Sequence, residues 1–242
     1  RFTNYYATDA PCLPSRAGLF LGRFGIHTGL VNHGGDAAEP FTIGRERGFK
    51  WQPEWDSWPM ALRRCGFYPV SVSPYAERHS AWWFHHGWRE FYNPGKGGGE
   101  RADEVVPYAL DWLQKHAQED DWFLHVNVWD PHTPYRTPED YGNPFEGEPI
   151  PDWISDEVIR RHRDGFGPHS AREPRGIAPG PDRPRFPAEI KDLADYRRWI
   201  DGYDVGIRYA DDWLGRILEA LEARGVLDET AVIISSDHGE NQ

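Results

Sequence analysis

The sequence is poor in cysteine and has no long apolar run. It contains two cysteines, Cys12 and Cys65, in 242 residues, which excludes a disulfide framework. No run reaches the roughly 20 apolar residues of a membrane-spanning helix, and no signal peptide opens the chain. Basic residues are also in the minority, with 27 against 39 acidic ones. The resulting net charge of -12 argues against a nucleic-acid partner.

The order of the apolar patterns predicts an α/β fold. The length suits one large α/β domain or two small ones. Short apolar runs typical of strands occupy Phe67–Ser73, Trp122–Trp129 and Thr230–Ser236. Helical spacing marks Trp58–Arg64, Ala102–His116 and Asp192–Arg224. Strands that alternate with helices in this way form a mostly parallel sheet flanked by helices.

Two features interrupt this pattern. Residues 143–187 are rich in proline and glycine, with one short helix expected at Ser155–Arg163. We expect a loop insertion or lid there, because so long a loop is usually functional or mobile. Gly202 and Gly206 lie within the last predicted helix, where we expect them to bend or break it.

Each of the three predicted strands leads into side chains that can take part in chemistry. They are Arg78 and His79 after the first, Asp130 and His132 after the second, and Asp237 and His238 after the third. Open parallel sheets bind ligands outside the carboxyl ends of their strands. We therefore expect these side chains to gather in one cleft.

Cys12 is expected at the N-terminus of a helix. Pro11 and Pro14 surround it, proline suits the first helical turn, and the apolar run Ala17–Leu21 follows. The free N-H groups and aligned dipoles of such a terminus favour a negatively charged nucleophile and lower the pKa of a thiol. Taken alone, a cysteine in this place is more simply explained as a small buried core residue.

The stretch Cys12-Leu13-Pro14-Ser15-Arg16 resembles the sulfatase signature Cys-x-Pro-Ser-Arg. The flanks Arg1–Asn4 and Gly22-Arg23 are also similar to those of sulfatases. The resemblance implies an alkaline-phosphatase-like α/β fold. It further implies that residues 1–242 are part of a single sulfatase catalytic domain truncated at both ends, since the family's metal-binding Asp-Asp pair should lie upstream and a further lysine downstream.

The resemblance also implies how residue 12 reacts. In sulfatases a maturation enzyme oxidises this cysteine to formylglycine, whose hydrate attacks the sulfur of a sulfate ester. Cys12 would then be the catalytic residue, and Arg16 would steady the hydrate. His132 lies in a His-x-Pro motif that resembles the family histidine contacting the sulfate and helping to protonate the leaving oxygen. Without the resemblance, His132 is more simply a loop histidine.

Asp237 and His238 resemble the metal ligands that sulfatases carry at the end of a strand. The resemblance implies a divalent metal, Ca²⁺ or alternatively Mg²⁺, bound by residue 12, Asp237 and His238. Such an ion would bind one hydroxyl of the hydrated formylglycine and lower its pKa. An Asp-His-Gly triplet by itself equally fits a capped turn.

The chain departs from the family after the first predicted strand. Sulfatases commonly carry Gly-Lys-Trp-His there, and its Lys and His hold the sulfate and the formylglycine. This sequence has Ser73-Pro74-Tyr75-Ala76 instead. Arg78 and His79 are the nearest replacements and our candidate substrate-binding residues, although they could equally cap or solvate the loop. The departure indicates a divergent branch of the family.

The sequence thus predicts a metal-dependent sulfatase that acts on a sulfated carbohydrate or a similar small ester. One alternative is a phosphonate or phosphate ester hydrolase, because phosphonate monoester hydrolases share the cysteine signature. Another is a non-catalytic binding relative, which the missing Lys and His would allow. The sequence does not determine the compartment, and the resemblance is compatible with a periplasmic or secreted location.

Overall fold

The computed structural model describes residues 2–38, 40, 57–165, 170–174 and 181–240. The chain divides into two compact units. The first comprises Arg1–Glu100, Val105–Asn127 and Leu218–Glu240, and the second comprises Arg101–Glu104, Val128–Ile217 and Asn241–Gln242. None of the helices in the described part of the chain is long and apolar enough to span a membrane.

A parallel sheet of three strands forms the centre of the first unit. Strand β1 (Tyr68–Val72) lies between β2 (Glu90–Tyr92) and β3 (Trp122–Val126), and it runs parallel to both. The structure therefore confirms the first two predicted strands and the parallel sheet. The sequence analysis did not predict strand β2, because three residues are too few to show a periodic pattern.

The prediction of a third strand was wrong. Residues Thr230–Ser236 form no strand and pair with none of the described strands. Val232, Ile233 and Ile234 expose 47%, 84% and 73% of their surface. β-branched residues favour strands, but a strand also needs a neighbour that exchanges backbone hydrogen bonds with it. The segment instead follows a short turn, η4 (Leu227–Glu229), as irregular chain.

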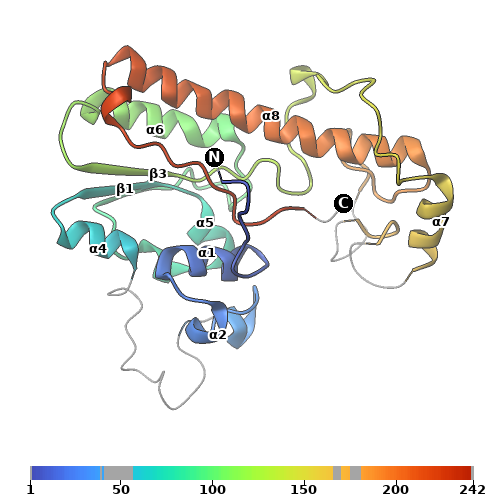
Figure 1. The fold of residues 1–242 in the computed structure, drawn as a ribbon, viewed down its shortest axis with the longest axis horizontal. Helices are drawn as coiled ribbons and strands as arrows, with labels where there is room; N and C mark the ends of the chain where they lie inside the picture. Colours follow the sequence, from blue (N-terminus) through green and yellow to red (C-terminus); the bar gives the residue numbers. More distant parts are fainter. Residues whose placement is uncertain (1, 39, 41–56, 166–169, 175–180, 241–242) are drawn as a thin grey trace. The chain divides into compact units, whose positions relative to one another are not determined.

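Helices lie on both sides of this sheet. Figure 1 shows α6 (Ala102–His116) on one side of β1 and β3, and α4 (Trp58–Arg64) and α1 (Cys12–Leu21) on the other. The sequence predicted the bounds of α4 and α6 correctly. The predicted apolar stripe of α6 is buried at Val105, Val106, Ala109 and Leu113. Shorter helical segments are α2 (Gly25–Thr28), η1 (Gly35–Ala38), α5 (Tyr75–His79) and η2 (Trp82–His85).

Aromatic side chains pack α1 and η2 against the sheet. Phe20 of α1 stacks on Trp58 with ring centroids 4.9 Å apart, and it meets the edge of Phe84 at 4.5 Å. His125 of β3 stacks on Trp88 at 5.5 Å. Large rings bury the most area per residue, so this cluster packs the C-terminal end of α1 against β3, where the Phe20 ring lies 5.4 Å from that of His125.

The second unit is built on a long helix. Helix α8 (Leu193–Ala223) continues for 31 residues, so Gly202 and Gly206 do not break it. They allow close approach instead: a Cβ at Gly202 would lie 2.0 Å from the carbonyl oxygen of Arg185, and one at Gly206 would lie 2.7 Å from Cβ of Pro131. A side chain at either position would collide with the neighbouring segment.

The segment 143–187 supplies part of a hydrophobic cluster in this unit. Its helix α7 (Asp156–Asp164) and nearby residues contribute Ile159, Ala171 and Phe186, which pack with Tyr196 and Trp199 of α8. The turn η3 (Glu139–Tyr141) precedes it. Residues 166–169 and 175–180 of the segment lie outside the described residues. A lid function for the segment stays a prediction.

Candidate functional site

Cys12 is the first residue of α1, as the sequence predicted. Pro11 precedes it in an extended conformation, and the Cys12 side chain is 4% exposed. The first N-H groups of a helix have no partner within the helix. One of them, from Leu13, donates to Nε2 of His33 at 3.1 Å. The helix start is therefore a place where side chains from other segments meet residue 12.

The C-terminal segment reaches the same helix start. Sγ of Cys12 lies 3.1 Å from Nε2 of His238. Arg16 donates from Nε to Oδ2 of Asp237 at 3.0 Å, and the Ser15 hydroxyl donates to the Asp237 backbone carbonyl at 2.5 Å. The structure thus brings together four of the residues singled out in the sequence: Cys12, Arg16, Asp237 and His238.

Asn127, which sequence analysis missed, joins this group to the sheet. It follows β3 directly, is 5% exposed, and accepts at Oδ1 both from Arg16 at 2.9 Å and from the Ser73 hydroxyl at 3.1 Å. Ser73 follows β1 directly. The sequence analysis missed both because the predicted strands ran to Ser73 and Trp129, whereas the observed strands end at Val72 and Val126.

His33 and His79 also lie near Cys12, in a group separate from Asp237 and His238. His79 is the last residue of α5, and its ring centroid is 4.7 Å from that of His33. Burial lowers the pKa of His79, while a hydrogen bond with Cys12 opposes that shift. The sequence named His79 as a substrate-binding candidate but gave no signal for His33, a histidine in a glycine-rich segment.

Arg78, the other candidate after β1, binds a loop. Its guanidinium donates to the carbonyl oxygen of Gly98 at 2.7 Å, and a Cβ at Gly98 would lie 2.2 Å from Cβ of Arg78. Gly98 has a positive φ of 75°. Arg78 therefore packs along the glycine-rich loop that follows β2, and its role toward a substrate stays a prediction.

His132 and Asp130 belong to the second unit. Nδ1 of His132 lies 2.7 Å from the carbonyl oxygen of Thr133. Because a carbonyl oxygen can only accept, Nδ1 is the donor, and proton transfer to or from a substrate would use Nε2. Asp130 accepts from the backbone N-H of Ala102 at 2.7 Å, at the first residue of α6. Burial raises the pKa of Asp130 to about 6. The convergence of His132 with Cys12 stays a prediction.

Side chains of both charges surround Cys12. A hydrogen bond with Cys12 raises the pKa of His238 to about 9, because a thiolate stabilises the imidazolium, although burial opposes this. The Arg16 guanidinium lies 5.0 Å from the centre of the Tyr75 ring, and burial raises the pKa of the Tyr75 hydroxyl. Two cationic side chains, Arg16 and protonated His238, therefore lie at the start of α1 despite the acidic balance of the whole chain.

Two groups of described residues could hold a metal ion, and they share Cys12. One is Cys12, Asp237 and His238, and the other is Cys12, His33 and His79. In each group the ligand atoms lie within 4.8 Å of one another. The first group contains a carboxylate, the donor that hard divalent cations prefer, and the second contains only sulfur and nitrogen donors. The residues present therefore fit a divalent cation beside residue 12.

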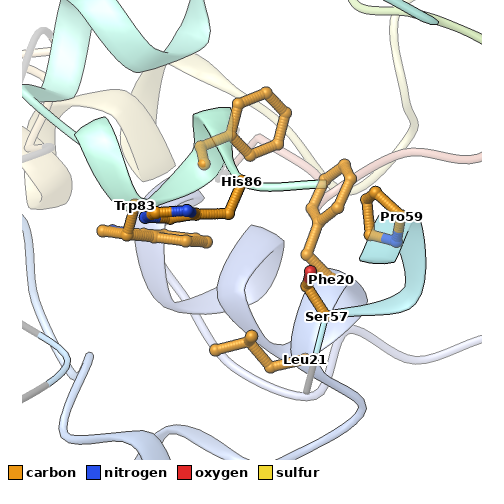
Figure 2. Close-up of a pocket in the computed structure, with 7 residues that line it drawn as sticks. Phe20, Leu21, Ser57, Pro59, Trp83 and His86 are labelled. Carbon is orange, nitrogen blue, oxygen red and sulfur yellow. The ribbon is translucent and has the colours of Figure 1, made fainter. Parts of the chain in front are cut away.

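A small hollow elsewhere in the first unit offers no comparable chemistry. Figure 2 shows its lining, which consists of Phe20, Leu21, Ser57, Pro59, Trp83, Phe84 and His86. Its polar side chains are one hydroxyl and one imidazole among apolar neighbours.

Sequence comparison finds one family over the full length. A model of the sulfatase family matches residues 1–242. The chain is 24% identical to a choline-sulfatase of Rhizobium meliloti (strain 1021), covering 99% of this chain and 50% of that protein. It is 22% identical to an N-acetylglucosamine-6-sulfatase of Bos taurus, covering 98% of this chain and 44% of that protein. The chain thus spans about half the length of the curated relatives it matches.

Solved structures show the same fold. A phosphonate monoester hydrolase of Agrobacterium radiobacter aligns with a TM-score of 0.57 at 18% identity, over 92% of this chain and 52% of that one. A protein solved in complex with its substrate D-glucosamine-2-N,6-O-disulfate aligns with a TM-score of 0.57 at 16% identity, over 94% and 56%. These likenesses establish the alkaline-phosphatase-like α/β fold that the sequence predicted.

Proposed function

The chain belongs to the sulfatase family, and we propose that it hydrolyses sulfate esters at the group around Cys12. A sulfated carbohydrate or a similar small ester is the substrate class we propose. One observation carries the proposal: the contact between Cys12 and His238, 226 residues apart, beside the Arg16–Asp237 pair. It joins the signature cysteine to the two residues that resemble the family's metal ligands.

Residue 12 is the proposed nucleophile. A maturation enzyme would convert Cys12 to formylglycine, and one hydroxyl of its hydrate would attack the ester sulfur as the bond from sulfur to the alcohol oxygen breaks. The second hydroxyl would then expel sulfate and restore the aldehyde. The protein contributes the position. Residue 12 is buried at the start of α1, where the helix N-terminus favours negative charge on the nucleophile and on the sulfuryl oxygens.

A divalent cation, Ca²⁺ or Mg²⁺, is the proposed cofactor. Asp237 and His238 would hold it together with residue 12, as the closeness of their ligand atoms supports. The ion would lower the pKa of a hydroxyl and add positive charge near the sulfate. Ser15 bonds to the backbone carbonyl of Asp237 and Arg16 bonds to its carboxylate, and together these hydrogen bonds orient the Asp237 side chain.

The remaining roles concern charge and protons. Arg16, held by Asn127 and Asp237, would balance negative charge as the ester reacts. His79 would contact residue 12 and the sulfate, with Arg78 as a further cationic candidate. His132 would protonate the leaving oxygen from Nε2, since its Nδ1 is held by the Thr133 carbonyl.

Mass spectrometry and turnover test the proposal together. The peptide spanning Cys12, taken from full-length protein made in its native host, should show conversion to the aldehyde. The same preparation should hydrolyse an aryl sulfate, lose activity after chelation and regain it with Ca²⁺ or Mg²⁺. An unmodified thiol in active enzyme would refute the nucleophile, and full activity of Asp237→Ala would refute the metal site.

The choice of ester separates the alternatives. Higher kcat/KM for an aryl phosphonate than for an aryl sulfate would make the protein a phosphonate ester hydrolase on the same scaffold. No turnover of either ester by fully converted, metal-loaded protein would make it a non-catalytic binding relative.

A further inference from the structure

Cys12, His33 and His79 form a second group of metal-ligating side chains that the sulfatase reaction does not use as a metal site. The three come from separate segments: the start of α1, the chain after α2 and the last residue of α5. Their ligand atoms lie within 4.8 Å of one another. Converting Cys12 to formylglycine removes the sulfur, so this group exists only in the unconverted protein.

The donor types select the metal. A thiolate with two imidazoles is a soft to borderline set, typical of zinc and unlike the oxygen ligands of Ca²⁺ and Mg²⁺. A tetrahedral zinc ion holds sulfur and nitrogen ligands about 3.5 Å apart. Because the ligand atoms lie within 4.8 Å of one another, side-chain movements of no more than about 1–1.5 Å would bring them to that spacing.

The three side chains meet at the start of α1. The N-terminus of α1 favours the thiolate of Cys12. Nε2 of His33 accepts from the Leu13 N-H at 3.1 Å, which holds the ring at the helix start; an ion would take the place of this N-H at Nε2 or bind Nδ1. The imidazole of His79 shares this space, with its ring centroid 4.7 Å from that of His33. Cys12 is buried, His79 is half-buried and His33 is exposed, so the group extends from the interior to the surface.

We propose that the protein with an unconverted Cys12 binds Zn²⁺ through Sγ of Cys12 and the imidazoles of His33 and His79. Three protein ligands leave a fourth position for water. The inference rests on the proposed function in one respect, that residue 12 is converted to formylglycine in the active enzyme. Zinc binding would then occupy the thiol that the maturation enzyme must oxidise, and it would distinguish precursor from mature protein.

Metal titration of the full-length protein tests the site. The protein is made without the maturation enzyme, and its thiol at position 12 is verified by mass. Co²⁺ should bind with the absorption band of thiolate coordination, and Zn²⁺ should displace it at one equivalent. His33→Gln and His79→Gln should each weaken Zn²⁺ binding by about tenfold or more, whereas the matched variant His27→Gln, at an exposed histidine of α2, should bind like the wild type.

The alkylation rate of Cys12 gives a second measurement that does not depend on the cobalt spectrum. Zn²⁺ should slow it in wild type and much less in His33→Gln. Absence of a thiolate band, or wild-type binding by both histidine variants, would overturn the proposal. So would loss of binding in Asp237→Asn with retention in His33→Gln, because that result puts the ion in the other group. These experiments use no turnover, so the zinc site and the sulfatase proposal can fail separately.

Discussion

Arg16 and Asp237 form an ion pair across 221 residues of sequence, with Nε of Arg16 3.0 Å from Oδ2 of Asp237. The two side chains are only 12% and 17% exposed, so water screens this pair less than a pair on the open surface. The pair fastens the C-terminal segment to the second turn of the helix that begins at Cys12. It therefore controls how close His238 lies to residue 12.

Asn127→Ala should lower activity without unfolding the protein. The substitution removes the acceptor that holds both Arg16 and the Ser73 hydroxyl. Loss of a hydrogen bond to a charged group costs about 1.5–3 kcal/mol, which corresponds to about a ten- to hundredfold loss of kcat/KM for an aryl sulfate. Asn93→Ala is the matched control, since Asn93 is exposed and bonds to Glu77. Equal kinetics in both variants would remove Asn127 from the site.

Gly202→Ala and Gly215→Ala should change stability in opposite directions although both lie within α8. The methyl group at position 202 would meet the Arg185 carbonyl at 2.0 Å and the Tyr135 ring at 2.8 Å, so we expect destabilisation by about 1–3 kcal/mol. The methyl group at 215 has no neighbour within 4 Å, and alanine should stabilise the helix by about 0.5–1 kcal/mol. Denaturant unfolding measures both. Destabilisation by Gly215→Ala would contradict the open surface there.

Asp130→Asn should remove a pH dependence of stability. Burial raises the pKa of Asp130 from 3.8 to about 6 in the folded protein, so folding favours the protonated carboxyl. The folded protein therefore loses stability relative to the unfolded chain as pH rises from about 4 to about 6, by up to about 3 kcal/mol. Asparagine stays neutral and still offers an oxygen to the Ala102 N-H.

Unfolding free energies of the wild type and Asp130→Asn, measured from pH 4 to pH 7, give the difference curve. The unfolding free energy of Asp130→Asn should increasingly exceed that of the wild type as pH rises toward 6, and the difference should then level off. Asp140→Asn, at an exposed aspartate, is the matched control. A flat curve for Asp130→Asn would mean that the carboxyl is not buried in solution.

His79→Ala and Arg78→Ala test the two candidates that stand in for the family's missing Lys and His. His79 hydrogen-bonds with residue 12 in the cysteine form, so we expect His79→Ala to lower kcat/KM by about ten- to hundredfold with an altered pH profile. Arg78→Ala should cost a similar factor if the guanidinium reaches the sulfate. A loss of stability with normal kinetics would instead assign Arg78 to the Gly98 carbonyl.

The sequence by itself determined the features that depend on neighbouring residues. Helical spacing located α4 and α6 to the residue, because burial of one helix face imposes a local period. Apolar runs located β1 and β3, because a strand covered on both faces is apolar at successive positions. The prolines around Cys12 predicted a helix start, because proline lacks the N-H that the first turn leaves without a partner.

Only the tertiary structure decided which distant groups meet. Thr230–Ser236 has the composition of a strand yet forms none, because strand pairing depends on a neighbour that composition does not reveal. Arg78 and His79 are adjacent in sequence, but Arg78 binds Gly98 while His79 lies with Cys12 and His33. Consecutive residues of a short helix point about 100° apart, and packing against the rest of the fold selects which of them faces the site.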